Sequence, residues 1–393
     1  MNIYFQVGCF NDIDHISPII WKCAQKGAKC FLLISRHYDW SSDYRIHFLK
    51  NLPQVKIVNF FGMNSPSLYG KIFRKLVYTK FFAKFFLKKN KISACVSEWY
   101  IPSNDFFGRF MAAAHELKIP CFAVPHGFNV HLNYNSKNAA SREKFKRLGA
   151  WANISAMNIC DVFVVDSLVN KQMNIDGGVK KEKCEAWGSS RFAPEWSNQN
   201  IKICPPFQPK NSFVDKTKVV FFLPHWRNNV DLPATMSLIR VLAESPDIHL
   251  VVKEHTRGNG EFPQNYRHQY DNLLHVEIDD LAHSPALINW ADIVINFGSS
   301  IGIDAVLQNK PLIYPAYLHG NTTIFDQDDA CYKTSSAEHT LKTIQSIKMG
   351  TNLILNENKI SFLKNTIYGG KEPHDILGYY SHRIMNSLTK PEE

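Results

Sequence analysis

Short apolar runs alternate with helical segments along the chain, and this alternation occurs in two successive series. In the first series, strands are predicted at residues 3–7, 30–35, 55–60, 94–97, 121–124 and 162–166, with helices such as 18–26 and 106–117 between them. Strands that alternate with helices are typical of parallel, doubly wound sheets. The first half therefore predicts one Rossmann-like domain.

A second series follows a proline-rich break. Residues 191–218 contain four prolines among Asn, Gln and Ser, a composition typical of an interdomain linker. Strands are then predicted at 219–223, 249–253, 275–277, 293–296 and 311–314, with helices at 235–243, 284–290 and 301–307. At 393 residues the chain is long enough for two cores of ordinary size.

We therefore predict an α/β protein with two Rossmann-like domains that face a cleft. The expected parts are a first domain at 1–195, a linker at 196–217, a second domain at 218–372, and a helix within 373–393 that crosses back to the first domain. Ligands in such folds bind beyond the carboxyl ends of the strands, so the polar residues after each strand are candidate site residues.

The net charge limits the kinds of binding partner, and the cysteine content indicates the cellular compartment. A net charge of +10 fits nucleic acid, an anionic membrane surface or anionic small molecules, and without a nucleic-acid-binding signature we expect no nucleic acid partner. The nine cysteines are scattered without a CxxC pair, which predicts reduced thiols and neither disulfides nor a zinc site. No signal peptide or membrane-spanning run is recognised, which predicts a cytoplasmic protein.

The segment 291–315 carries the strongest local signal for function. A buried strand is predicted to end just before a turn of small residues, and a helix begins just after it. The candidate site residues of the turn and the helix are Gly298, Ser299, Ser300 and Asp304. Free amides at a helix N-terminus beside two hydroxyls suit a phosphate group. The same residues also fit a plain strand–turn–helix in which a serine caps the helix.

This segment resembles the donor-binding segment of GT-B glycosyltransferases of bacterial capsule and teichoic-acid assembly. In those enzymes a strand, a Ser-Ser turn, a helix with an acidic residue and Gly/Asn-Lys-Pro precede another strand. The resemblance covers most of the second half and includes both capsule β-Kdo transferases and CDP-glycerol glycerophosphotransferases. It implies a nucleotide-activated donor held by Gly298, Ser299, Ser300 and Asp304, with no metal and no cofactor.

Two upstream loops are similar to further elements of these families. Arg227 and Asp231 follow the strand at 219–223, as in the "TWRD" and "RGD" elements, which implies a phosphate contact for Arg227 and a nucleophile or base in Asp231. The spacing between them departs from both patterns, and Asp231 equally fits a cap of the next helix. Lys253 and His255 resemble the "KxHP" element, which implies a charge partner and a proton donor or phosphate contact; a structural histidine is the alternative.

The first domain offers further candidates. His126 resembles the histidine of the "HG" element of the glycerophosphotransferases, which implies a base or acceptor contact, or else it hydrogen-bonds its loop. Glu98 ends a strand and is a candidate acid or base, or a salt-bridged surface carboxylate. Ser189 and Arg191 match the "G-x-P/S-R" element, which implies a donor contact.

A basic, aromatic amphipathic stretch runs from Lys71 to Lys89. It fits a helix that lies on the inner membrane surface or guides a lipid-linked acceptor. It also fits a packed helix with its phenylalanines inward and its lysine stems outward. Both interpretations stay open at the level of the sequence.

These observations predict a glycosyltransferase that moves a sugar from a nucleotide donor to a bacterial surface polysaccharide or lipid-linked glycan. Kdo from CMP-Kdo is the preferred donor because of Asp231 and the basic charge. Glycerol- or ribitol-phosphate transfer from a CDP-polyol and a nucleotide-sugar epimerase are the enzymatic alternatives. A non-catalytic scaffold that binds a nucleotide sugar is the alternative from another class.

Overall fold

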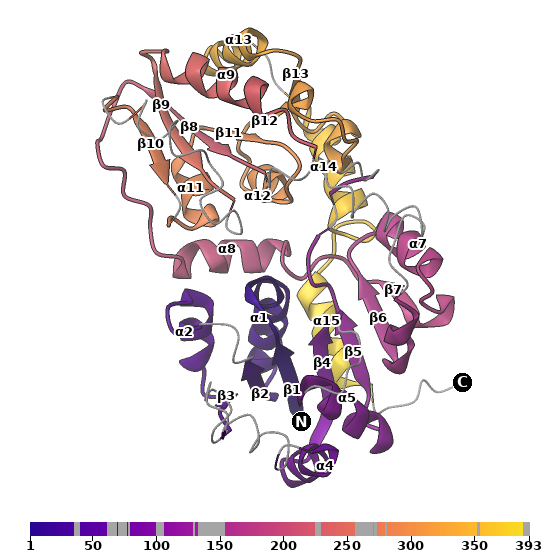
Figure 1. Ribbon diagram of the computed structural model, residues 1–393. Coiled ribbons are helices and arrows are strands. Elements are labelled where there is room, and N and C mark those ends of the chain that lie inside the picture. Colours follow the sequence, from indigo (N-terminus) through magenta and orange to yellow (C-terminus); the bar gives the residue numbers. More distant parts are fainter. Residues whose placement is uncertain are drawn as a thin grey trace. The chain divides into compact units, whose positions relative to one another are not determined.

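The chain forms two compact units in the computed structural model (Figure 1). The structure describes residues 1–34, 40–60, 69, 77, 79–99, 106–128, 130–132, 154–224, 229–255, 270, 273–279, 281–351 and 354–387. The first unit comprises Met1–Phe128, Trp151–Trp196 and Lys364–Glu393, and the second comprises Asn129–Ala150 and Ser197–Leu363. Each unit contains one parallel sheet with helices between its strands, so the predicted α/β class is confirmed.

The first sheet has the strand order β3-β2-β1-β4-β5-β6-β7, and its pairings are parallel. The strands are β1 (Asn2–Val7), β2 (Lys29–Ile34), β3 (Val55–Val58), β4 (Ile92–Glu98), β5 (Cys121–Val124), β6 (Val162–Val165) and β7 (Cys184–Ala186). The chain builds outward from β1 in one direction and then from β4 in the other. The carboxyl ends of β1 and β4 therefore form the topological switch point, where open α/β sheets bind ligands.

Helices cover both faces of this sheet. They are α1 (Phe10–Gln25), α2 (Tyr44–Lys50), α4 (Lys80–Lys89), α5 (Phe106–Glu116), α7 (Leu168–Asp176) and α15 (Ile376–Met385). Tyr4 of β1 stacks on Phe110 of α5 with ring centroids 5.0 Å apart, and Phe86 of α4 meets Tyr4 edge-on. Tyr4 of β1 and the alternate residues Phe31 and Leu33 of β2 thus belong to one cluster with residues of α4 and α5, as the strand period allows.

The C-terminal segment belongs to the first unit, where α15 packs beside α1 (Figure 1). Tyr380 of α15 donates a hydrogen bond to the carbonyl oxygen of Gly188 at 2.8 Å. Arg383 forms a two-pronged ion pair with Glu185 at 2.8 and 2.9 Å. Planar guanidinium–carboxylate pairs of this kind fix orientation as well as contributing energy.

The second sheet has the order β10-β9-β8-β11-β12-β13, and its pairings are also parallel. Its strands are β8 (Thr217–Phe222), β9 (Ile248–Lys253), β10 (Val276–Asp279), β11 (Ile293–Asn296), β12 (Leu312–Pro315) and β13 (Tyr332–Thr334). Helices α9 (Leu232–Ala243) and α13 (Ala337–Lys348) pack together, as do α11 (Ser284–Trp290) and α12 (Ile301–Leu307); α14 (Asn356–Thr366) follows α13. The switch point of this sheet lies between β8 and β11.

The segments that differ from the sequence-based expectation include α1, the linker and residues 130–132. Helix α1 begins at Phe10 rather than at residue 18, because Asp12 caps its first turn and the helix accommodates Pro18. Helix α8 (Pro194–Ile203) extends into the expected linker, and it begins with a proline at a position where no backbone donor is lost. Residues 130–132 precede the linker in the sequence but belong to the second unit. Two backbone hydrogen bonds of 2.9 Å join them to Thr322 and Ile324 of that unit.

Candidate functional site

The switch point of the first sheet is organised by Asp12. This residue lies in the first turn of α1, directly after β1, and is fully buried. Its Oδ2 accepts hydrogen bonds from the backbone amides of Gly8 at 2.6 Å and Cys9 at 2.8 Å. A Cβ on Gly8 would lie 3.0 Å from that oxygen, so the absence of a side chain lets the turn approach the carboxylate. The second oxygen, Oδ1, remains to receive other donors.

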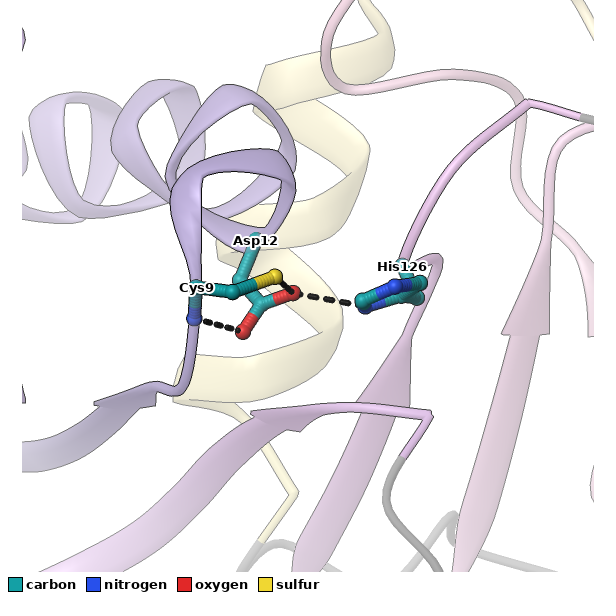
Figure 2. A group of neighbouring side chains, drawn as sticks. All are labelled: Cys9, Asp12 and His126. Carbon is teal, nitrogen blue, oxygen red and sulfur yellow. Dashed lines mark hydrogen bonds and ion pairs between the residues drawn. The ribbon is translucent and has the colours of Figure 1, made fainter. Parts of the chain in front are cut away.

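His126 meets this carboxylate from the end of β5. Its Nδ1 lies 2.7 Å from Oδ1 of Asp12 and 3.0 Å from Oε2 of Glu98, the last residue of β4. Figure 2 shows the imidazole facing Asp12, with Cys9 beside the carboxylate. The Cys9 thiol also donates to Oδ1 of Asp12 at 3.3 Å. Strands β1, β4 and β5 are neighbours in the sheet, so their carboxyl ends bring these side chains together.

The two carboxylates fix the charge of His126. Hydrogen bonds to Asp12 and Glu98 raise the pKa of His126 to about 10, against a smaller opposing effect of burial. The imidazole is therefore protonated at neutral pH, while 43% of its side chain stays exposed to solvent. Burial raises the pKa of Glu98 above the usual carboxyl range, and the hydrogen bond from His126 counters this. The cluster thus places a cation and a partly desolvated carboxyl side by side.

The same side chains offer donor atoms suited to a metal ion. The Sγ of Cys9, a carboxylate oxygen of Asp12 and a ring nitrogen of His126 lie within 4.8 Å of one another. Thiol, carboxylate and imidazole groups are all common zinc ligands. Hydrogen bonds among the three already satisfy these atoms, and the expectation of a metal-free site stays a prediction.

Two other predicted residues lie in the same unit. Ser189 is fully buried, and its backbone amide donates to the carbonyl oxygen of Ile367 at 2.8 Å. The guanidinium of Arg191 lies 3.8 Å from the carboxylate of Asp14 and 4.7 Å from the ring centroid of Phe192. Ser189 therefore supports the chain at the C-terminal segment, and the donor contacts predicted for both residues stay predictions.

The turn after β11 lies at the switch point of the second sheet. Gly298 has a φ of +66°, a conformation that favours glycine, and a Cβ there would lie 3.7 Å from Cβ of Pro224 after β8. Ser299 Oγ accepts a hydrogen bond from the Ile301 amide at 3.4 Å, whereas the Ser300 side chain does not cap α12. Asp304 is 9% exposed in the first turn of that helix.

The upstream loops of the second unit give a mixed outcome. Asp231 is exposed and caps α9, because its Oδ1 accepts from the Ala234 amide at 3.0 Å. This geometry matches the structural alternative considered for that residue. Lys253 is buried at the end of β9, and His255 is half-buried two positions beyond it. Arg227 lies outside the described residues.

Three residues near these turns were not predicted. These are Asp12, Cys9 and His131, and of them Asp12 carried a usable signal, since an acidic residue in the first helical turn after a strand is suited to capping. His131 approaches the turn after β11, with its Cε1 3.5 Å from where a Cβ on Gly298 would lie. Burial lowers the pKa of His131 to about 4, so its imidazole is neutral. No sequence pattern connects residues 130–132 with the second unit.

No known protein-family model matches the sequence, and no curated protein matches it significantly. Solved structures, however, match almost the whole chain. The UDP-GlcNAc 2-epimerase of Methanocaldococcus jannaschii, in complex with UDP-GlcNAc and UDP, is similar with a TM-score of 0.56 and 17% identity over 99% of each chain. The UDP-GlcNAc 2-epimerase of Neisseria meningitidis, bound to UDP-GlcNAc, has a TM-score of 0.61 and 13% identity over 99% of each chain.

Anabaena Alr3699/HepE in complex with UDP is also similar. Its TM-score is 0.53 at 12% identity, and the match covers 99% of this chain and 100% of that one. At identities this low, the likeness establishes the fold alone. The strand orders of the two sheets and these matches together show that the chain has the GT-B fold, with two Rossmann-like domains.

Proposed function

We propose that the protein is an enzyme that transfers the glycosyl group of a nucleotide sugar to a glycan acceptor. The observation that carries the proposal is the protonated His126 held between Asp12 and Glu98 at the switch point of the first sheet. Perturbed ionisable groups at such a position are typical of active sites. The UDP and UDP-GlcNAc complexes of proteins with the same fold support a nucleotide sugar as the ligand.

In the proposed reaction, Glu98 accepts the proton of an acceptor hydroxyl. The acceptor oxygen forms a bond to the anomeric carbon, and the bond from that carbon to the donor phosphate breaks, leaving the electron pair on the nucleotide. The raised pKa of Glu98 makes it a stronger base than an ordinary carboxylate, while His126 keeps the ionised form accessible. A protonated His126 acts as an acid or a cation, so the charged role is favoured over the base role expected from the sequence.

In this proposal the second unit holds the donor. Gly298, Ser299 and Ser300 are the proposed phosphate contacts, with Lys253 and His255 contributing positive charge or a proton. The glycine conformation allows backbone amides of the turn to approach a ligand closely. Arg227 and Asp304 remain predicted donor contacts on the strength of the resemblance alone.

The nucleobase of the donor distinguishes the candidate reactions from one another. The preference for CMP-Kdo as the donor rested partly on Asp231. The position of Asp231 as the cap of α9 weakens that preference. Transfer of a polyol phosphate from a CDP donor stays a further prediction. Epimerisation of a UDP sugar is the second candidate function, because several of the solved structures with this fold are UDP-GlcNAc 2-epimerases.

A thermal-shift panel with UDP, CMP, CDP and GDP tests the proposal on the intact chain. We expect one pyrimidine nucleotide to raise the melting temperature in a concentration-dependent way, because a ligand that binds only the folded state stabilises it. UDP alone would favour the uridine donor, and CMP or CDP alone would favour the cytidine donors. Stabilisation by none of the four at millimolar concentration would overturn the proposal.

A further inference from the structure

Helix α4 has one face that packs into the first unit. Ala83 and Leu87 are fully buried on this face. Phe82 and Phe86 pack edge-on against Phe60, with ring centroids 5.1 and 5.3 Å apart. These four side chains account for the attachment of the helix to the sheet.

The opposite face exposes two large aromatic rings. Phe81 is 80% exposed and Phe85 is 56% exposed. Residues four apart lie one above the other on a helix, so the two rings form one continuous apolar strip. At Phe81 and Phe85 the structure differs from the packed-helix alternative, in which the phenylalanines point inward. Adjacent side chains are rotated by about 100° around the helix axis. Phe81 therefore cannot share a face with Phe82, nor Phe85 with Phe86.

Lysines surround this strip. Lys80, Lys84, Lys88 and Lys89 all belong to α4, and the helix contains no acidic residue. Lys80 and Lys84 form ion pairs with Glu116 of α5. Lys88 and Lys89 are exposed, and the Lys89 ammonium lies 5.7 Å from the ring centroid of Phe85. Exposed aromatic rings within a basic face are the pattern of a helix that lies in a membrane interface.

We propose that the exposed face of α4 docks on an anionic lipid bilayer. The rings of Phe81 and Phe85 enter the interface, and Lys88 and Lys89 contact the negatively charged headgroups. No helix among the described residues is long and apolar enough to cross a membrane, so the proposed contact is peripheral. A second copy of the same face would bring lysines against lysines, which disfavours self-association through α4.

Vesicle flotation of the full-length protein tests this proposal. Vesicles of pure phosphatidylcholine are compared with vesicles that contain phosphatidylglycerol in phosphatidylcholine. We expect flotation only with the anionic vesicles, and at least tenfold weaker binding at high salt because exposed charges are screened. Absence of flotation with anionic vesicles, or equal flotation with both compositions, would overturn the proposal.

Paired variants assign the binding to α4. The double variants Phe81→Ser with Phe85→Ser and Lys88→Glu with Lys89→Glu should each reduce bound protein at least tenfold. The matched controls are Leu168→Ser with Val169→Ser, an exposed apolar pair on α7, and Lys180→Glu with Lys181→Glu, an exposed lysine pair. The controls should float like the wild type. Normal flotation of both α4 variants, or equal losses in the controls, would contradict the proposal.

Two further measurements distinguish membrane docking from misfolding and from self-association. Circular dichroism melting of the α4 variants should match the wild type, because the changed side chains are solvent-exposed. Sedimentation velocity without lipid should show no concentration-dependent association. Self-association that the Phe81→Ser and Phe85→Ser changes abolish, without any vesicle binding, would identify α4 as a protein interface and overturn the membrane proposal.

Discussion

The Nδ1 atom of His126 lies 2.7 Å from Oδ1 of Asp12, a fully buried carboxylate whose other oxygen is held by two backbone amides. The contact links the loop after β5 to the first turn of α1. It fixes which ring nitrogen faces the carboxylate and favours the protonated ring. The properties proposed for His126 therefore depend on a residue that precedes it by more than a hundred positions in the sequence.

Replacement of Asp12 by Asn should lower the pKa of His126 from about 10 toward its ordinary value. The hydrogen bond to Asp12 is the largest cause of the raised pKa, and a neutral amide removes its charge. An NMR titration of the histidine ring protons measures this pKa. Glu98→Gln is the matched variant and should produce a smaller decrease. An unchanged pKa in Asp12→Asn would show that this contact does not set the protonation of His126.

The raised pKa of His126 also predicts how stability depends on pH. The pKa in the folded state, about 10, exceeds the unfolded value, so protonation stabilises the fold fully below about pH 6.5, and this contribution disappears as the pH rises toward 10. The denaturant midpoint of the wild type should therefore exceed that of His126→Gln at pH 6. The two midpoints should converge by pH 10. A difference that grows with pH would have the wrong sign.

Substitution of Gly188 tests the attachment of the C-terminal segment. Gly188 has a φ of +91°, and a Cβ there would lie 2.5 Å from the carbonyl oxygen of Ile367. Gly188→Ala should cost about 3 kcal/mol or more, from backbone strain combined with this clash. Gly27 has a φ of +83° with open space around it, so Gly27→Ala should cost only about 1 kcal/mol. Equal losses in urea unfolding would show that the close approach to Ile367 is absent.

The role of Asp231 is tested by Asp231→Ser, which preserves a capping oxygen but removes the carboxylate. Because Asp231 is exposed and caps α9, we expect activity within about threefold of the wild type and stability within about 0.5 kcal/mol. Asp231→Ala should lose about 1 kcal/mol of stability. A loss of activity of a thousandfold or more in Asp231→Ser, with normal stability, would restore the nucleophile or base inferred from the resemblance.

Most strands and helices were predictable because their signals are local, whereas the short strands β7 and β13 were not predicted. Apolar runs such as Cys121–Val124 and Ile293–Asn296 have the predicted bounds, since each is buried on both faces of its sheet. The first turns of α1 were missed because Asp12 stabilises them through a turn that precedes the helix. The segment 130–132 pairs with the second unit through backbone atoms, which carry no sequence signal.

The candidate site was predictable only in part, for a similar reason. His126 and Glu98 each end or follow a strand, and parallel topology brings such positions to one edge of the sheet. Their protonation states depend on the distances to Asp12 and on burial, which a sequence does not specify. For Asp231 the sequence allowed both a catalytic role and a cap, and the hydrogen bond to Ala234 shows the cap.

The most direct test of the proposed function is the fate of a bound nucleotide sugar. The sugar conjugate of whichever nucleotide stabilises the protein is incubated with the wild type and with Glu98→Gln, together with bacterial surface glycan, and nucleotide release is followed by chromatography. We predict release by the wild type and a rate at least about a hundredfold lower in Glu98→Gln, as expected for loss of a general base. A changed sugar configuration without transfer to the glycan would indicate an epimerase. A bound nucleotide sugar that stays chemically unchanged, or is consumed equally fast by both proteins, would contradict the account.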